Sequence, residues 1–253
     1  MREGQRKGAN AAEPCVAESS DTAVQRVVNE VLVGLRHGRY RPGQRLIVSD
    51  LSEQLGISTV PVREALHILS GREVVELRPQ RGFRIRELSP KEILDTLRIW
   101  PFIAQLNFEL AAQRLATGRH GRQRAEIQAV RTRIQRALET RISIDLFSSI
   151  QLLYDLCATI NDNAYFSTLR GPLHVELYYR QVADILPGPL WDRYVANITE
   201  VLELILAGDS PGVVRSFSRH HRTVLDYLTR ELPIRADSTF KPPALTKSAR
   251  ARS

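Results

Sequence analysis

Cysteine is nearly absent from this chain of 253 residues, which has only Cys15 and Cys157. A disulfide framework is therefore excluded, and two thiols so far apart are typical of a reducing compartment. No apolar run approaches the roughly 20 residues that a membrane-spanning helix needs. The N-terminal segment MREGQRKGANAAEP also lacks the apolar stretch of a signal peptide. We therefore expect a cytoplasmic protein that does not bind membranes.

The common sequence motifs of enzymes are missing as well. The chain has no G-x-S-x-G elbow, P-loop, G-x-G-x-x-G, H-E-x-x-H or C-x-x-C motif. Asp209, His220 and a serine could form a triad only if folding happened to bring them together. We expect no catalytic residues and no enzymatic activity, and keep an enzyme that uses a cavity of the helical region as the less favoured alternative.

Basic residues exceed acidic ones by 36 to 28, which gives a net charge of +8. The excess is uneven: residues 1–19 are neutral, 20–88 carry +3, 89–232 carry +1 and 233–253 carry +4. The last segment is rich in proline and poor in apolar residues, which predicts disorder. We expect disordered tails at residues 1–20 and 233–253. The basic C-terminal tail would act as a solubilising segment or, as the alternative, add nonspecific phosphate contacts.

Three short helices are predicted after the N-terminal tail. Apolar residues between 24 and 35 recur at i, i+3, i+4, i+7, i+8 and i+11, which is the stripe of one helix. Ser49 begins a second helix, which ends at Gly56. Ser58 caps a third helix over residues 59–69, whose first turn tolerates a proline because its N–H groups have no helical partner.

A β-hairpin is predicted next, because the apolar period changes to strict alternation. Residues 75–78 and 83–86 form its strands, and the loop between them contains Gly82. The apolar face is expected to hold Val75, Leu77, Phe83 and Ile85. The other face carries Arg78, Arg84 and Arg86, with Arg81 at the tip.

The chain from Ser89 onward has helical periodicity throughout. Ser89-Pro90 marks the start of a helix that runs to about Ala116, with Pro101 as a kink. Further helices are expected near residues 122–139, 142–160, 163–184, 189–207 and 211–231. The predicted fold is mainly α, with a winged helix-turn-helix of three helices and a β-hairpin in residues 21–88, followed in residues 89–232 by an all-α bundle of six to seven helices.

The helices and basic hairpin before residue 88 indicate DNA binding. Thr59 and Arg63 lie at i and i+4 opposite the apolar side of the third helix, and the N-terminal residues of such a helix contact base edges in the major groove. The loop Gln80-Arg81-Gly82 is thin enough to enter a minor groove. The alternative is a solvated basic hairpin on an ordinary α+β domain.

The stretch from Tyr40 to Ile85 resembles the DNA-binding domain of GntR-family bacterial transcriptional regulators. Four segments match in order and spacing: Pro42-Gly43-Gln44-Arg45-Leu46, Leu51-Ser52-Glu53-Gln54-Leu55-Gly56-Ile57-Ser58, Pro61-Val62-Arg63-Glu64-Ala65-Leu66 and Arg81-Gly82. The resemblance implies DNA contacts at Ser58, Thr59, Arg63, Arg81 and Gly82, with Ser49 near a phosphate.

Two positions of the third helix depart from that family. Thr59 stands where the family usually has Arg, and Val60 where it has Thr or Ser. Thr59 cannot make the bidentate contact to guanine that Arg would make, and Val60 adds no donor. Base readout is therefore expected to differ from the usual operator or to depend more on the wing.

Residues 89–232 resemble the FCD effector domain of FadR-like GntR regulators. This resemblance depends on the order of the helices and on Arg98, Asn163, Gly208-Asp209 and His220. It implies a homodimer on a palindromic operator and a central cavity for a small organic acid or similar effector. Most members are repressors that ligand releases from DNA, so a repressor is the default. The alternative is a DNA-binding protein without effector control, which the nearly neutral bundle disfavours because nonspecific binding needs charge.

Many FCD domains hold a metal with one Asp and three His. Counting from Asn163 carries these positions onto Ile150, Tyr154, Ile198 and His220, of which only the last is a ligand of that set. We therefore expect no family-type metal and no cofactor. The expected effector contacts are Arg98, Ile150, Tyr154, Ile198 and His220.

Each polar member of that set has a second interpretation. His220 is either a hydrogen-bonded core residue or a ligand contact, with His221 beside it on the surface. Tyr154 is either the substitute for a metal-binding His or a core residue with its hydroxyl at the cavity edge. Arg98 is expected to be buried, with an internal acid or an effector carboxylate as its partner.

Overall fold

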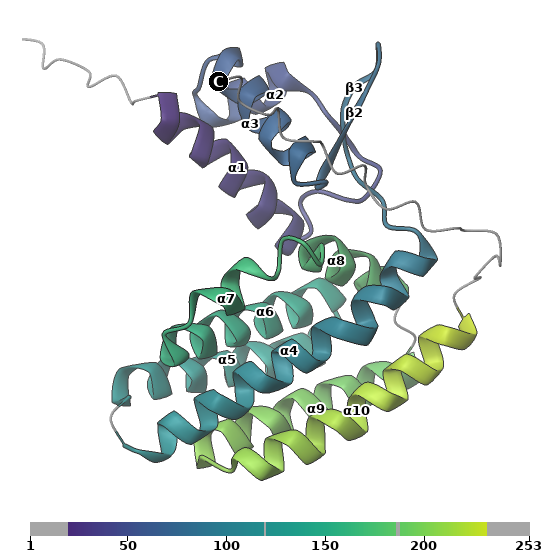
Figure 1. The fold of residues 1–253 in the computed structure, drawn as a ribbon. Coiled ribbons are helices and arrows are strands. Elements are labelled where there is room, and N and C mark those ends of the chain that lie inside the picture. The colour runs from purple at the N-terminus through teal and green to yellow at the C-terminus, as the bar shows by residue number, and fades with distance from the viewer. Residues whose placement is uncertain (1–19, 119, 186–187, 232–253) are drawn as a thin grey trace, which may run out of the picture.

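The computed structural model describes residues 20–118, 120–185 and 188–231. A winged helix-turn-helix lies at one end of the molecule and a helical bundle at the other (Figure 1). The predicted fold class is confirmed. The tails predicted at residues 1–20 and 233–253 lie outside the described residues, except for Ser20, where the first helix begins.

Three helices form the N-terminal unit: α1 (Ser20–Arg36), α2 (Val48–Leu55) and α3 (Thr59–Gly71). The stripe predicted on α1 is its packing face, with these residues buried: Val24, Val27, Val28, Val31 and Leu35. α2 begins one residue before Ser49, with Ile47 at its N-cap. It ends at Gly56, whose backbone adopts the left-handed conformation that a glycine allows at a helix end.

A small antiparallel sheet completes this unit. Its strands are β1 (Arg45–Leu46), β2 (Val75–Arg78) and β3 (Gly82–Ile85), in the order β1-β3-β2. The hairpin pairs Val75 with Ile85 and Leu77 with Phe83, so the four residues predicted to share a face do share one. The sequence did not predict β1, which is only two residues long and pairs with β3 across about 40 residues of chain.

One part of the predicted apolar face of the hairpin is wrong. Val75, Phe83 and Ile85 are buried, but Leu77 is 50% exposed. β2 and β3 extend beyond the helices (Figure 1), so the outer half of the hairpin has no core beneath it. The hairpin therefore presents its tip to the surroundings.

A capping box begins α4 (Pro90–Ala116), as Ser89-Pro90 predicted. The backbone N–H of Glu92 donates to Ser89 Oγ at 3.3 Å, and the N–H of Ser89 donates to Glu92 Oε2 at 2.9 Å. Pro101 lies within the helix, which continues through it to Ala116. This helix connects the sheet to the bundle.

The remaining described helices follow the predicted order with one correction. They are α5 (Gly121–Thr140), α6 (Ser143–Asn161), α7 (Ala164–Thr168), α8 (Val175–Ile185), α9 (Gly188–Ala207) and α10 (Ser210–Glu231). The single helix expected at residues 163–184 is thus two helices. The turn between them contains Gly171-Pro172, and a residue before proline avoids the helical conformation.

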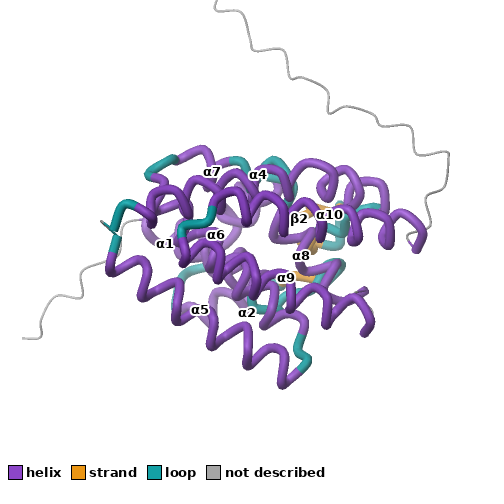
Figure 2. Tube along the Cα trace, turned by 90° about the horizontal axis from the view of Figure 1, so that it is seen from below, coloured by secondary structure: helices purple, strands orange, loops and turns teal. Residues whose placement is uncertain are grey.

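The bundle packs around α4, which contacts α6, α9 and α10. Its helices lie in front in Figure 2, where the strands show only between them. The two units also touch, because α1 packs against α6 and α8.

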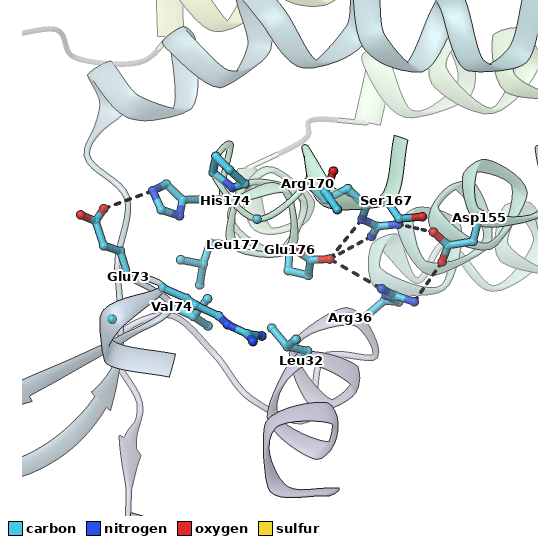
Figure 3. Close-up of a pocket in the computed structure, with 15 residues that line it drawn as sticks. Leu32, Arg36, Glu73, Val74, Asp155, Ser167, Arg170, His174, Glu176 and Leu177 are labelled. Carbon is cyan, nitrogen blue, oxygen red and sulfur yellow. Dashed lines mark hydrogen bonds and ion pairs between the residues drawn. The ribbon is translucent and has the colours of Figure 1, made fainter. Parts of the chain in front are cut away.

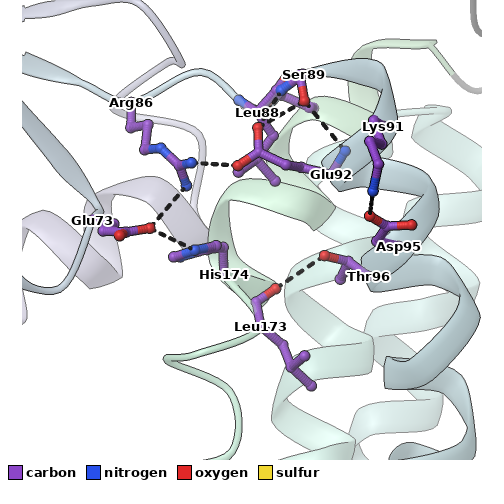
Figure 4. A network of polar contacts seen from close by, with 11 residues as sticks. Glu73, Arg86, Leu88, Ser89, Lys91, Glu92, Asp95, Thr96, Leu173 and His174 are labelled. Carbon is purple, nitrogen blue, oxygen red and sulfur yellow. Dashed lines mark hydrogen bonds and ion pairs between the residues drawn. The ribbon is translucent and has the colours of Figure 1, made fainter. Parts of the chain in front are cut away.

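Polar contacts join the units near the start of α4 (Figure 4). Arg86, just after β3, binds Glu92, and Glu73 Oε2 lies 3.3 Å from His174 Nε2. Within the bundle, Thr96 of α4 donates to the carbonyl of Leu173 at 3.2 Å and so fixes the turn that carries His174. The contacts of Arg86 and Glu73 hold the winged helix against the bundle.

Candidate DNA interface and bundle cavity

The outer face of α3 carries the residues predicted to read bases. Thr59 and Arg63 are exposed, and the opposite face is buried through these residues: Val62, Ala65, Leu66 and Leu69. The side chain of Arg63 makes no hydrogen bond or ion pair within the described part of the chain. Its guanidinium is therefore available for an external acceptor, and the two donors of its fork suit guanine or phosphate.

Ser58 occupies the N-cap of α3 with an extended backbone, as predicted, but its hydroxyl makes no capping hydrogen bond. The exposed hydroxyl and the first N–H groups of the helix are thus free to bind a phosphate oxygen. Ser49 is also exposed, although its hydroxyl donates to Asp50 Oδ1 at 3.1 Å. The neighbouring carboxylate opposes a phosphate at that position.

The tip of the hairpin is a tight turn in which the N–H of Arg81 donates to the carbonyl of Arg78 at 3.0 Å. Gln80 and Gly82 both have positive φ, +60° and +75°. A glycine suits this conformation, and no atom lies where its Cβ would be. Gln80 and Arg81 are exposed, so the structure brings the predicted tip residues together on a narrow projection.

The other hairpin arginines do not form the free basic face that alternation suggested. Arg78 donates to Glu76 Oε2 at 3.0 Å, Arg84 binds the carbonyl of Gly43, and Arg86 binds Glu92. Each is therefore occupied by the protein itself. Among the arginines of the hairpin, Arg81 at the tip is the one whose side chain makes no hydrogen bond or ion pair within the described residues.

Val60 is better placed to contact DNA than its lack of a hydrogen-bond donor suggests. It is 70% exposed on the first turn of α3, beside Thr59. An apolar side chain in that position can contact the methyl group of a thymine. The loss of a hydrogen-bond donor at Val60 thus does not remove the residue from base readout.

Four of the five predicted effector residues meet in one cavity of the bundle: Ile150, Tyr154, Ile198 and His220. They come from α6, α9 and α10, and Phe108 of α4 and Phe217 of α10 are among the other residues that line the cavity. The cavity holds about 30 Å³, room for a water molecule or two. The positions carried over from the family are thus neighbours in space, although the space between them is nearly filled.

Tyr154 is a core residue, and its hydroxyl donates to the carbonyl of Phe166 at 2.7 Å. Its ring contacts Trp100, with the ring centroids 4.7 Å apart. Burial raises the pKa of the hydroxyl. These contacts fix Tyr154 as a neutral wall of the cavity.

His220 lines this cavity and has a ring nitrogen without a hydrogen-bond partner. Its Nε2 is buried without a hydrogen-bond partner among the described residues, and its ring packs edge-on against Tyr194 at 4.4 Å. Burial, with a smaller contribution from His221, lowers its pKa to about 4. His220 is therefore neutral at pH 7 and can offer one hydrogen bond to a ligand.

Two predictions about neighbouring residues are wrong. Arg98 is on the surface with its side chain 54% exposed, paired with Asp95 Oδ1 at 3.2 Å. The buried stripe of α4 passes through Leu94, Leu97 and Trp100, which leaves Arg98 outside it. His221 is 7% exposed rather than on the surface, because its ring packs against Phe102.

Two arginines of the bundle, Arg170 and Arg180, are buried, and neither was predicted from the sequence. Arg170 has the larger set of acidic partners. It is 5% exposed, and its guanidinium lies 3.0 Å from Glu176 Oε1 and donates to Gln151 Oε1 at 2.6 Å. Asp155 is a further partner. No local pattern marks Arg170, since its partners come from α6 and α8.

The residues at the family metal positions do not fit a metal. Ile150 and Ile198 have no donor atom, and the hydroxyl of Tyr154 is bound to a backbone carbonyl. Across the described ranges, no group of three or more His, Cys, Asp or Glu residues is placed to hold an ion. In the same ranges, no helix has the length and apolar character needed to cross a membrane.

The exposed third helix, the wing beside it and the attached helical domain define the class of helix-turn-helix transcriptional regulators. Residues 23–85 match the profile of the bacterial regulatory proteins of the gntR family. The DNA-binding region of the chain is therefore similar to that family, and the expectation that the protein is not an enzyme agrees with this similarity.

Curated relatives support this assignment over part of their length. The HTH-type transcriptional regulator McbR of Escherichia coli (strain K12) is 32% identical over 113 residues, which are 45% of this chain and 49% of McbR. The HTH-type transcriptional repressor GlaR of the same strain is 32% identical over 84 residues, which are 33% of this chain and 36% of GlaR. The matches thus span half or less of these relatives.

Solved structures extend the likeness in fold to the bundle. The structure of E. coli McbR/YncC superposes with a TM-score of 0.68 at 21% identity, over 83% of this chain and 99% of that one. A GntR transcriptional regulator from Rhodococcus sp. RHA1 gives a TM-score of 0.63 at 16% identity, over 83% and 99%. A winged helix followed by a bundle of helices is therefore a fold that this chain shares with these proteins.

Proposed function

We propose that this protein binds a palindromic operator as a homodimer and that a small organic acid in the helical domain controls its affinity for DNA. The observation that carries the proposal is the cluster of exposed, unpaired groups at one end of the molecule. Thr59 and Arg63 belong to α3, Ser58 is its N-cap, and Arg81 lies in the turn between β2 and β3. α3 and this hairpin lie at the same end of the molecule (Figure 1). A helix and a wing arranged in this way can occupy adjacent grooves of one half-site.

A row of exposed apolar residues on α4 supports the homodimer. Ile99, Phe102 and Leu106 are 51%, 58% and 47% exposed and lie at i, i+3 and i+7. Such a row on a helix is typical of a surface that another protein covers. A second copy of the chain would also supply the second recognition helix that a palindrome needs.

The bundle cavity supports effector control, although an effector would have to enlarge it. Ligand sites hold about 300–1,000 Å³, far more than this cavity holds. A surface pocket of about 360 Å³ between α9 and α10 shares Asn197 and His220 with the cavity. Movement of His220 or of Phe217 would join the two spaces. We take release of DNA by the ligand as the default direction, as in a repressor.

Footprinting on genomic DNA tests the proposal and also yields the operator. We expect a protected inverted repeat with two half-sites about 10 base pairs apart, centre to centre, or a multiple of that spacing. Protection without any sequence preference would contradict a specific regulator and favour a DNA-binding protein without effector control. A thermal-shift screen of organic acids would then separate these alternatives, because a ligand that binds only the folded state raises the melting temperature.

A further inference from the structure

A second pocket lies between the two domains and not inside the bundle. It has a volume of about 800 Å³ (Figure 3). One wall comes from α1 and from the turn between α3 and β2, and the other from α6, α8 and the turn between α7 and α8. Pockets of this volume at a domain boundary are common ligand sites.

The walls of this interdomain pocket are held in place by the protein. Arg36 of α1 lies 3.2 Å from Asp155 Oδ2 and 3.6 Å from Glu176 Oε1. The buried Arg170 binds the same two carboxylates. The contact between Glu73 and His174 closes the other end (Figure 3). The pocket is therefore formed before any ligand enters.

These pairs leave one cation of the lining without an acid. Arg36 and Arg170 are neutralised by Asp155 and Glu176, whereas Arg72 is exposed and has no side-chain partner within the described residues. Arg72 follows α3 at the end opposite its DNA-reading residues. An anion entering the pocket would find an unpaired guanidinium at its rim.

Two further nitrogen atoms of the lining lack partners. Arg36 Nε and His174 Nδ1 are buried and make no hydrogen bond within the described ranges. A ligand that accepts a hydrogen bond from Arg36 Nε would be favoured, since a buried polar atom without a partner costs free energy. Nε2 of His174 lies beside the carboxylate of Glu73, and its Nδ1 can form a second hydrogen bond with a ligand.

The rest of the lining is apolar. Leu177 is fully buried beneath the pocket, and Leu32, Val74 and Pro172 add aliphatic surface from both domains. A ligand that complements this site has an apolar body and one acidic group. A nucleotide or an inorganic anion would leave the aliphatic floor without a partner.

We propose that the interdomain pocket binds an organic carboxylate with an apolar body, whose acidic group pairs with Arg72. This site is separate from the bundle cavity. Because the ligand touches both domains, it binds the docked arrangement more tightly than any arrangement in which the winged helix has moved away. Binding therefore stabilises the docked arrangement and couples the ligand to the position of the DNA-reading helix.

Isothermal titration of the full-length protein with octanoate tests the proposal, with octanol as the uncharged probe of the same length. We expect saturable binding of one octanoate per chain, and octanol at least about tenfold weaker because it cannot pair with Arg72. Absence of saturable octanoate binding to the folded protein would overturn the proposal, and so would equal affinity for octanol.

Two variants place the bound octanoate. Arg72→Ala should weaken binding at least about tenfold, and Thr168→Trp should abolish it by filling the rim, where Thr168 is exposed. Arg215→Ala removes an exposed arginine of α10 that does not line the pocket, and should bind octanoate as the unchanged protein does. Unchanged binding in both pocket variants would mean that octanoate binds elsewhere and that the proposal is wrong.

Discussion

At the scale of single residues, His220 links the bundle cavity to the stability of the fold. It contacts Tyr194 and faces the pocket that Arg193, Glu200 and Arg219 line, where Glu200 and Arg219 pair with each other. Burial and the neighbouring His221 lower its pKa from 6.5 to about 4. Between about pH 4 and 6.5, His220 is therefore neutral in the folded protein but protonated in the unfolded chain.

Because of His220, the free energy of unfolding should decrease as the pH is lowered. The loss begins near pH 6.5, where the unfolded residue takes up a proton, and is complete near pH 4, where the folded one does. A shift of this size corresponds to about 3 kcal/mol. Urea unfolding between pH 4 and 7 should show a shallower pH dependence for His220→Leu. Equal slopes for the variant and the unchanged protein would contradict this pKa.

Arg63 is the residue of α3 that we expect to contribute most to base readout. Arg63→Ala should weaken operator binding by about 1–3 kcal/mol, because a bidentate contact to a base is lost. The melting temperature should not change, since Arg63 is exposed and its side chain makes no hydrogen bond or ion pair within the described residues. Gel-shift titrations on operator and on scrambled DNA measure both affinities, with Arg215→Ala as the control. An equal loss on both DNAs would place Arg63 on a phosphate instead.

At the scale of elements, the wing should act through groove shape and phosphate rather than base identity. Its tip carries Arg81 on a narrow turn with no acidic partner in the described chain. Arg81→Ala should therefore weaken binding to all operator variants by a similar factor. Titration of a set of single-base operator variants checks this. A loss confined to one operator position would show that Arg81 reads a base.

Elements with local signals were predicted well from the sequence. The apolar stripe of α1, the Ser89-Pro90 start of α4 and the alternation of β2 and β3 each depend on residues close together in the chain. The strand β1 was missed because its two residues gain their partners from β3, far along the chain. The break after α7 did have a local signal, the Gly171-Pro172 pair, which the helical periodicity on either side obscured.

The two candidate sites differ in how much of each could be predicted from the sequence. The residues predicted to contact DNA lie on one exposed helix face and in one turn, so their placement in the fold depends on local structure. The cavity positions Ile150, Tyr154, Ile198 and His220 came from a family resemblance and do meet in space. The size of the cavity and the exposure of Arg98 could not be predicted, because both depend on how three helices pack against α4.

At the scale of the whole molecule, the apolar row on α4 makes a prediction about assembly. Ile99→Glu would place a charge in the proposed dimer surface and should shift the protein toward monomer at micromolar concentrations. Leu138→Glu changes a residue of α5 that is 41% exposed and should leave the assembly unchanged. Sedimentation velocity distinguishes the two. A dimer that persists in Ile99→Glu would exclude this face of α4 as the interface.

The salt dependence of DNA binding tests where the net charge of +8 acts. Residues 233–253 carry +4, whereas the winged helix of residues 20–88 carries only +3 and binds several of its arginines internally. Each phosphate that a cation neutralises steepens the slope of log affinity against log salt by about 0.9. If Arg63 and the wing provide the phosphate contacts, deleting residues 233–253 should leave most of the slope in place. If the deletion removed most of the salt slope, the tail would be the main source of nonspecific affinity for DNA. The operator contacts would then provide specificity but little of the electrostatic attraction.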